Sequence, residues 1–139
     1  MKRMLLFMMA LMLMLGTVSA QQSNANAQNG KERIEQQVRH YTAVFALNEA
    51  QAQQFTTLYR EYCKKMRAIH DSYYQPRPSD GATLTDEQLE KRILDNFAQS
   101  RAILDVREQY YKQFRQILTP TQVNQIFEDE KARRAQMKR

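Results

Sequence analysis

The sequence has little of what most often cross-links a fold or interrupts helices. Its 139 residues include one cysteine, three glycines, three prolines and no tryptophan. The single cysteine, Cys63, excludes a disulfide within the chain, so the fold depends on packing alone. We find no glycine-rich phosphate loop, no activated serine context, no paired carboxylates and no strand pattern. We therefore predict an all-α protein that is not an enzyme, with no catalytic residue, no metal and no cofactor.

The first twenty residues are predicted to be a secretory signal peptide. Lys2 and Arg3 precede an apolar run over residues 4–15, and small residues at 18–20 form a cleavage signature. The run is too short to be a stable membrane span. We therefore expect cleavage after Ala20 and export, with no membrane-spanning helix in the mature chain.

Positive charge is concentrated at the C-terminus. Five basic residues and no acidic one occupy residues 131–139, which we call the basic tail. When these five, Lys2 and Arg3 are set aside, 14 basic and 15 acidic residues remain in 21–130. Because this body is near neutral, we expect no nucleic-acid partner. The tail has two interpretations, a solvated helix end that favours the helix dipole or a weak contact with anionic envelope surfaces.

Three segments share a leucine, a capping residue and a glutamine at the same spacing. Asn and Thr side chains accept a hydrogen bond from the amide three residues on, and the glutamine reaches back to the amide of the cap. Each segment therefore predicts the start of a helix, and we call it a capping box. The residues are Leu47, Asn48 and Gln51; Leu84, Thr85 and Gln88; and Leu118, Thr119 and Gln122.

Apolar periodicity predicts one helical domain over residues 31–139, after a disordered N-terminus at 21–30. Helices are expected over residues 31–45, from the first box to residue 74, from the second box to residue 117, and from the third box onward. Residues 75–81 contain two prolines and an Asp-Gly, which end a helix. We therefore predict that the second and third helices form a long antiparallel hairpin, with a shorter helix at each end of the domain.

The third predicted helix carries more apolar surface than one partner helix covers. One stripe consists of Ile93, Phe97, Leu104, Tyr111 and Leu118, and a second of Ile103, Val106, Tyr110, Phe114 and Ile117. We expect a second copy of the chain to cover part of this face and the remainder to bind partners. The alternative is that the first and fourth helices cover all of it. The predicted binding surface joins the second stripe to Tyr62, and its edge consists of Arg60, Lys64, Arg67 and Arg107.

Cys63 and the two histidines do not predict a metal site within one chain. Cys63 and His70 are seven residues apart, about 10 Å of helix rise, whereas zinc ligands lie about 2.0–2.3 Å from the ion. An antiparallel dimer that pairs either residue with its copy remains the alternative. For Cys63 a buried structural role is favoured over an intermolecular disulfide or a thiol sensor. His40 is interpreted as a surface or partly buried structural residue.

The signal peptide, the helical pattern and the repeated boxes together resemble the Spy/CpxP family of periplasmic proteins, which is named for its Leu-Thr-x-x-Gln motif. The boxes at residues 47–51 and 118–122 match the family's two positions, the first with Asn in place of Thr. The resemblance implies a thin, curved helical homodimer. It also implies a periplasmic, ATP-independent chaperone that binds unfolded or partly folded envelope proteins and limits their aggregation. The alternative it implies is a regulator of envelope or metal stress that acts on a membrane sensor, although the histidine-rich segments of zinc-responsive members are missing.

Overall fold

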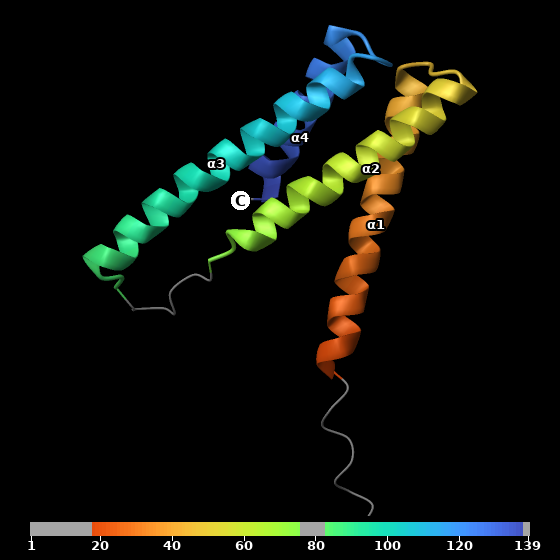
Figure 1. Ribbon diagram of the computed structural model, residues 1–139. Helices are drawn as coiled ribbons and strands as arrows, with labels where there is room; N and C mark the ends of the chain where they lie inside the picture. The colour runs from red at the N-terminus through yellow and green to blue at the C-terminus, as the bar shows by residue number, and fades with distance from the viewer. Residues whose placement is uncertain (1–17, 76–82, 138–139) are drawn as a thin grey trace, which may run out of the picture. The chain divides into compact units, whose positions relative to one another are not determined.

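The computed structural model of the protein describes residues 18–75 and 83–137, which form four α-helices and no strand (Figure 1). The helices are α1, Val18–Val44; α2, Glu49–Ser72; α3, Asp86–Phe114; and α4, Pro120–Met137. The all-α prediction is therefore confirmed for the described residues. Internal contacts divide the chain into two compact units, residues 1–37 and 38–139, so α1 belongs partly to each.

Helix α1 begins earlier than the sequence pattern predicts. It starts at Val18 rather than at residue 31, and it includes residues 21–30, for which we predicted disorder. Alanine and glutamine in that segment have favourable helix propensities, and its one glycine, Gly30, costs only about 1 kcal/mol. Residues 1–17 lie outside the described part, and cleavage after Ala20 stays a prediction. None of the helices in the described part has the length and apolar character needed to cross a membrane.

A tight turn joins α1 to α2. The amide of Leu47 donates to the carbonyl of Thr42 at 3.1 Å, and the amide of Ala46 donates to that of Ala43 at 3.1 Å. These are the two bonds of a Schellman motif, which ends a helix with one residue in the left-handed region. That residue is Ala46, with φ of 49°, a conformation that glycine adopts more readily.

All three capping boxes are present as hydrogen bonds. The amide of Gln51 donates to Asn48 Oδ1 at 2.9 Å, and the amide of Asn48 donates to Gln51 Oε1 at 3.1 Å. The same reciprocal pairs join Thr85 to Gln88 and Thr119 to Gln122. The boxes therefore fix where α2, α3 and α4 begin.

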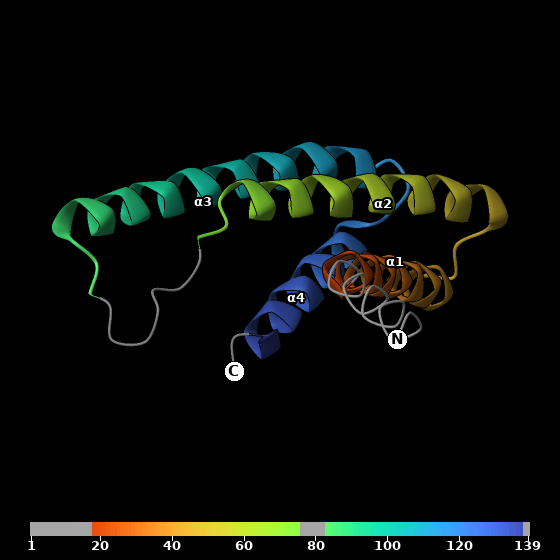
Figure 2. The same cartoon turned by 90° about the horizontal axis from the view of Figure 1, so that it is seen from below.

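Helices α2 and α3 lie side by side and run in opposite directions (Figures 1 and 2). Near the end of α2, Gln75 accepts a hydrogen bond from Arg92 Nε at 2.9 Å. Further back along α2, Lys65 Nζ donates to Gln109 Oε1 at 3.4 Å. At the start of α2, the ring of Phe55 lies 6.0 Å from that of Phe114. The contacts thus pair ever later residues of α3 with ever earlier residues of α2.

The core of the second unit is a cluster of aromatic rings, which we call the ring cluster. It joins the end of α1, the first two thirds of α2 and the end of α3, and its ring centroids lie 5.4–6.3 Å apart. Such ring pairs contribute about 0.5–1.5 kcal/mol each beyond their burial. Its members are Tyr41, Phe45, Phe55, Tyr59, Tyr62, Tyr110 and Phe114, all of them buried.

We predict that Thr119→Ala lowers the free energy of unfolding by about 1 kcal/mol, because the amide of Gln122 loses its acceptor at the start of α4. Urea unfolding followed by circular dichroism measures the change. Thr121→Ala is the matched control, since Thr121 is exposed in the first turn of the same helix. Equal losses in the two variants would contradict the capping role.

Candidate functional surface

The two apolar stripes of α3 have different environments. In the second stripe, Tyr110 and Phe114 are buried in the ring cluster, and Ile103, Val106 and Ile117 are half-buried. In the first stripe, Leu118 is buried at the turn into α4, whereas the other four side chains are exposed. The second stripe is therefore mainly core.

This placement corrects part of the predicted binding surface. Tyr62, Tyr110 and Phe114 were expected on that surface, but no more than 2% of each side chain is exposed. Their rings pack against one another, and the ring of Phe127 of α4 lies 6.2 Å from that of Tyr62. A partner therefore cannot reach these three rings in the folded chain.

The basic edge of the predicted surface is divided. Arg60, Lys64 and Arg67 are exposed along α2, as an edge requires. Arg107 is half-buried, lies over the ring of Phe127 at 5.7 Å, and has an Nε atom that is buried without a hydrogen-bond partner. Arg107 therefore belongs to the contact between α3 and α4.

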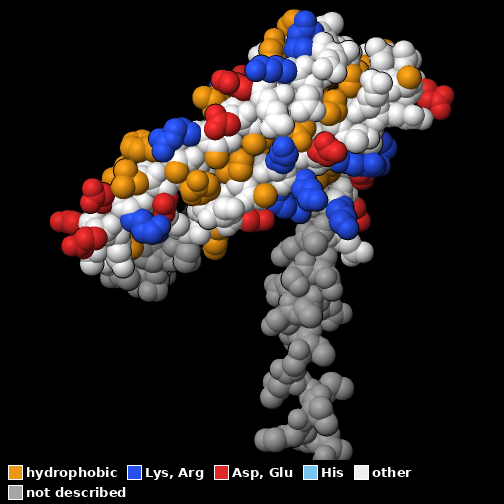
Figure 3. All heavy atoms as spheres, in the orientation of Figure 1, with side chains coloured by type: hydrophobic (Ala, Val, Ile, Leu, Met, Phe, Trp, Pro, Cys, Tyr) orange, Lys and Arg blue, Asp and Glu red, His pale blue; other side chains and the backbone are white. Residues whose placement is uncertain are grey.

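Six large apolar side chains are exposed along α3, with exposed polar residues such as Ser100 and Glu108 between some of them, and we call these six the α3 row. Each is 42–57% exposed, and the row extends over 22 residue steps, which corresponds to about 33 Å along the helix. Figure 3 shows hydrophobic side chains along α3 and acidic ones at its N-terminal end. Four members belong to the first stripe, whereas Leu89 and Leu94 belong to neither of the two predicted stripes. The row consists of Leu89, Ile93, Leu94, Phe97, Leu104 and Tyr111.

Exposed charges of both signs border the α3 row. Glu90, Arg101, Glu108 and Lys112 are exposed and lie within one helical turn of its members. In the first turn of α3, a backbone hydrogen bond, assisted by the Thr85 hydroxyl, lowers the pKa of Glu87. The row is therefore an apolar strip with a mixed-charge border.

A partly buried carboxylate, Glu130 on α4, joins three helices. Its Oε2 accepts a hydrogen bond from the Tyr62 hydroxyl of α2 at 2.5 Å and pairs with Arg107 Nη2 of α3 at 3.3 Å. Its Oε1 pairs with Arg134 one turn later. Burial opposes ionisation of Glu130, but the hydrogen bonds from Tyr62 and Arg134 and the attraction of both arginines outweigh it and lower the pKa of the carboxyl group.

A second polar contact attaches α4 to α1. The Tyr41 hydroxyl donates to Asp129 Oδ2 at 3.1 Å and accepts from Arg133 Nη1 at 3.4 Å. Burial raises the pKa of Tyr41, so the phenol stays neutral and available as a donor. Most of the basic tail lies in α4. Within it, Arg133 contacts Tyr41 and Arg134 pairs with Glu130. Residues 138 and 139 lie outside the described part.

The cysteine and the histidines lie apart from any metal-binding group. Across residues 18–75 and 83–137, no three His, Cys, Asp or Glu side chains are placed to hold an ion together. Cys63 is half-buried, and burial raises the pKa of its thiol to about 11, which keeps it protonated and unreactive. His70 is exposed beside Gln99 at 3.4 Å, and His40 is exposed with its ring at the edge of Tyr41.

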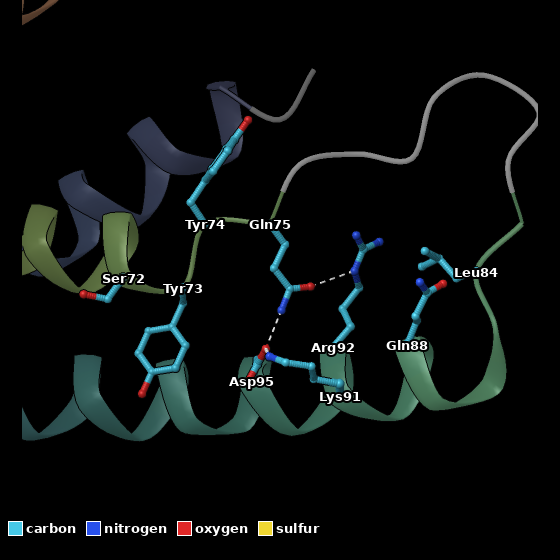
Figure 4. A pocket seen from close by; sticks show the side chains of 9 residues that line it. All are labelled: Ser72, Tyr73, Tyr74, Gln75, Leu84, Gln88, Lys91, Arg92 and Asp95. Carbon is cyan, nitrogen blue, oxygen red and sulfur yellow. Dashed lines mark hydrogen bonds and ion pairs between the residues drawn. The ribbon is translucent and has the colours of Figure 1, made fainter.

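A pocket of about 360 Å³ lies between the end of α2 and the start of α3 (Figure 4). The side-chain Nε2 of Gln75 donates to Asp95 Oδ2 at 2.6 Å, and Lys91 Nζ pairs with the same carboxylate oxygen at 2.6 Å. Figure 4 shows Tyr73 pointing toward α3 and Tyr74 pointing away from it. Because these polar groups bind one another, we interpret the pocket as part of the contact that joins the two helix ends and not as a ligand site.

We predict that Glu130→Gln flattens the loss of stability in acid. The lowered pKa means that Glu130 stabilises the fold above its usual value of 4.5, and that this contribution is lost as the pH falls through the lower folded-state value. Urea unfolding at a series of pH values measures the slope. At neutral pH the variant should be less stable by about 2 kcal/mol, because it weakens the bonds of Arg107 and Arg134. Parallel stability curves for the two proteins would contradict the assignment.

Comparison with known proteins gives a family and no characterised relative. No curated protein and no solved structure matches the chain significantly. Residues 20–126 match a family described as a domain of unknown function, DUF4890. The match covers more than half of the chain, from α1 to the first half of α4. The protein therefore belongs to the DUF4890 family.

Proposed function

We propose that the protein is a periplasmic, ATP-independent chaperone that binds unfolded or partly folded envelope proteins and limits their aggregation. The observation that carries this proposal is the α3 row, six large apolar side chains exposed along one helix. Several large apolar side chains exposed along one helix are typical of a binding site. The location rests on the signal peptide predicted at residues 1–20.

The chemistry of the α3 row suits clients of many sequences. Its members include Leu and Ile side chains, one Phe and one Tyr, which contact apolar segments without directional bonds. The mixed charges beside it, including Glu90 and Arg101, contact polar residues of either sign. Because these contacts are not directional, the client is held weakly and released without an energy source.

The resemblance to the Spy/CpxP family supports the same assignment. We propose that α2 and α3 act as the long hairpin of that family, and that the chain works as a thin, curved homodimer. The row on α3 lies on an arm of this hairpin, where a client is able to lie along it. The exposed basic residues of α2 from the predicted edge, Arg60, Lys64 and Arg67, then serve as a polar edge for the same clients.

The chaperone proposal predicts a specific loss in Phe97→Ser. Mature protein at a stoichiometric amount should suppress the aggregation of a denatured client without ATP, and Phe97→Ser should suppress it at least about threefold less, because one exposed ring of the row is lost. Light scattering follows the aggregation. Tyr74→Ser is the matched control, because Tyr74 is an exposed aromatic residue outside the row.

Two results would decide against the chaperone. No suppression by the unmodified protein with several clients would end the proposal. Tight binding to one membrane sensor domain without such suppression would favour the regulator of envelope stress instead. Equal losses in Phe97→Ser and Tyr74→Ser would show that the α3 row is not the binding surface.

The homodimer is tested separately. In sedimentation equilibrium the mature protein should have twice the mass of one chain. Ile93→Ser and Leu104→Ser report whether the α3 row also forms the dimer contact, since both side chains are more than half exposed in one chain. A single-chain mass at all concentrations would contradict the dimer and leave the client test unaffected.

A further inference from the structure

The second half of α4 lacks an apolar anchor. The buried apolar residues of this helix end at Ile126, and none of residues 129–134 belongs to the core. Figure 2 shows the C-terminal end of α4 pointing away from α2 and α3. We call residues 129–134 the cover segment. A helix end without buried apolar contacts opens at low free energy, because nothing but polar bonds has to break.

Polar bonds alone fix the cover segment to the rest of the unit. The Tyr62 hydroxyl and Arg107 bind Glu130 at 2.5 and 3.3 Å, and Tyr41 binds Asp129 at 3.1 Å. Each bond joins α4 to a different helix, α2, α3 or α1. Bonds to charged groups contribute about 1.5–3 kcal/mol each, so a small number of them keeps the segment closed.

Apolar surface lies next to the cover segment. Tyr59 and Tyr62 of α2 are buried, and Cys63 follows them on the same helix, half-buried. The charges of Glu130 and Arg133 both act on the Cys63 thiol, and that of Arg133 acts on Tyr59. Opening of the segment would uncover these three side chains, since the segment binds the Tyr62 hydroxyl and its charges reach Tyr59 and Cys63.

We propose that residues 129–134 are a cover, held closed by Glu130, whose opening exposes a second apolar surface for the same clients. This surface consists of Tyr59, Tyr62 and Cys63 of α2. Its use by clients rests on the proposed chaperone function, whereas the opening itself does not. The covered surface lies on α2, which packs beside the α3 helix that carries the row, so a client already bound to the row is able to extend onto it.

The single cysteine gives a direct test, because Cys63 reacts with iodoacetamide only when the reagent reaches it. We expect slow labelling of the native protein relative to the chain in urea, and labelling about tenfold faster in Glu130→Gln. Glu128→Gln is the matched control, since Glu128 is exposed, makes a salt bridge only with Lys131, and undergoes the same change. Equal labelling rates in the two variants would overturn the cover.

Two further measurements exclude misfolding of the variant and a change in the thiol pKa as causes of faster labelling. Tyr62→Phe keeps the ring and removes only the hydroxyl that binds Glu130, so labelling should rise about threefold or more even if Glu130→Gln fails to fold. The negative charge of Glu130 also raises the pKa of the thiol, so labelling is recorded across the pH range in which Cys63 titrates. A lower pKa shifts the midpoint of this profile, whereas opening raises its plateau. A shifted midpoint with an unchanged plateau would overturn the proposal.

An aggregation assay with a denatured client tests this proposal separately from the chaperone function itself. Glu130→Gln should suppress client aggregation at least about twofold better per chain than Glu128→Gln, because more apolar area is accessible. Faster labelling with unchanged suppression would overturn the second client surface and leave the α3 row intact. Suppression by the unmodified protein with unchanged labelling in Glu130→Gln and Tyr62→Phe would retain the chaperone and reject the cover.

Discussion

The packing of tilted and edge-to-face aromatic rings between α2 and α3 is the contact on which the rest of the second unit depends. With one cysteine, the chain has no internal disulfide to hold these helices together. The other two helices attach to the same rings, since Tyr41 of α1 packs on Phe55 and Phe127 of α4 packs on Tyr62. The rings therefore serve at once as the core of the helix pair and as the platform that positions α1 and α4.

The interface between α2 and α3 changes character along its length. The buried residues of α2 end at Met66, and beyond it the two helices meet through His70 with Gln99 and through Gln75 with Arg92. This part of the interface holds few apolar side chains, such as the half-buried Tyr73. The leucine, isoleucine and phenylalanine residues in the first half of α3 are exposed for that reason, and the accessible surface of the helix follows from the limited extent of its core.

Helix identity and helix starts could be predicted from the sequence, because they depend on local chemistry. Asn48 and Thr85 accept hydrogen bonds from residues three positions away, so spacing alone locates them. The accessible face of α3 could not be predicted, because two stripes of similar composition lie side by side on it. The choice between them depends on which stripe meets the rings of α2, and the residues that make this contact, Tyr62 with Tyr110 and Phe55 with Phe114, are far apart in sequence.

The start of α1 shows a second limit of sequence reasoning. A polar segment with few apolar residues is typical of disorder, and residues 21–30 have that composition. Alanine and glutamine are also good helix formers, and a helix that already exists is extended at little expense, since nucleation is the unfavourable step. Composition therefore does not decide whether such a segment extends the helix that follows it.

The order of the contacts along the chain has a consequence for folding kinetics. The bonds that close α4 over the other helices join residues 68 and 88 positions apart, whereas Gln75 and Arg92 are 17 positions apart. Short loops close first, because the entropic cost of closure grows with loop length. The polar end of the α2–α3 pair therefore meets before the rings of α2 and α3 do. A folding chain would pass through a state in which α2 and α3 are paired at their polar end and the rings are still accessible to other unfolded chains.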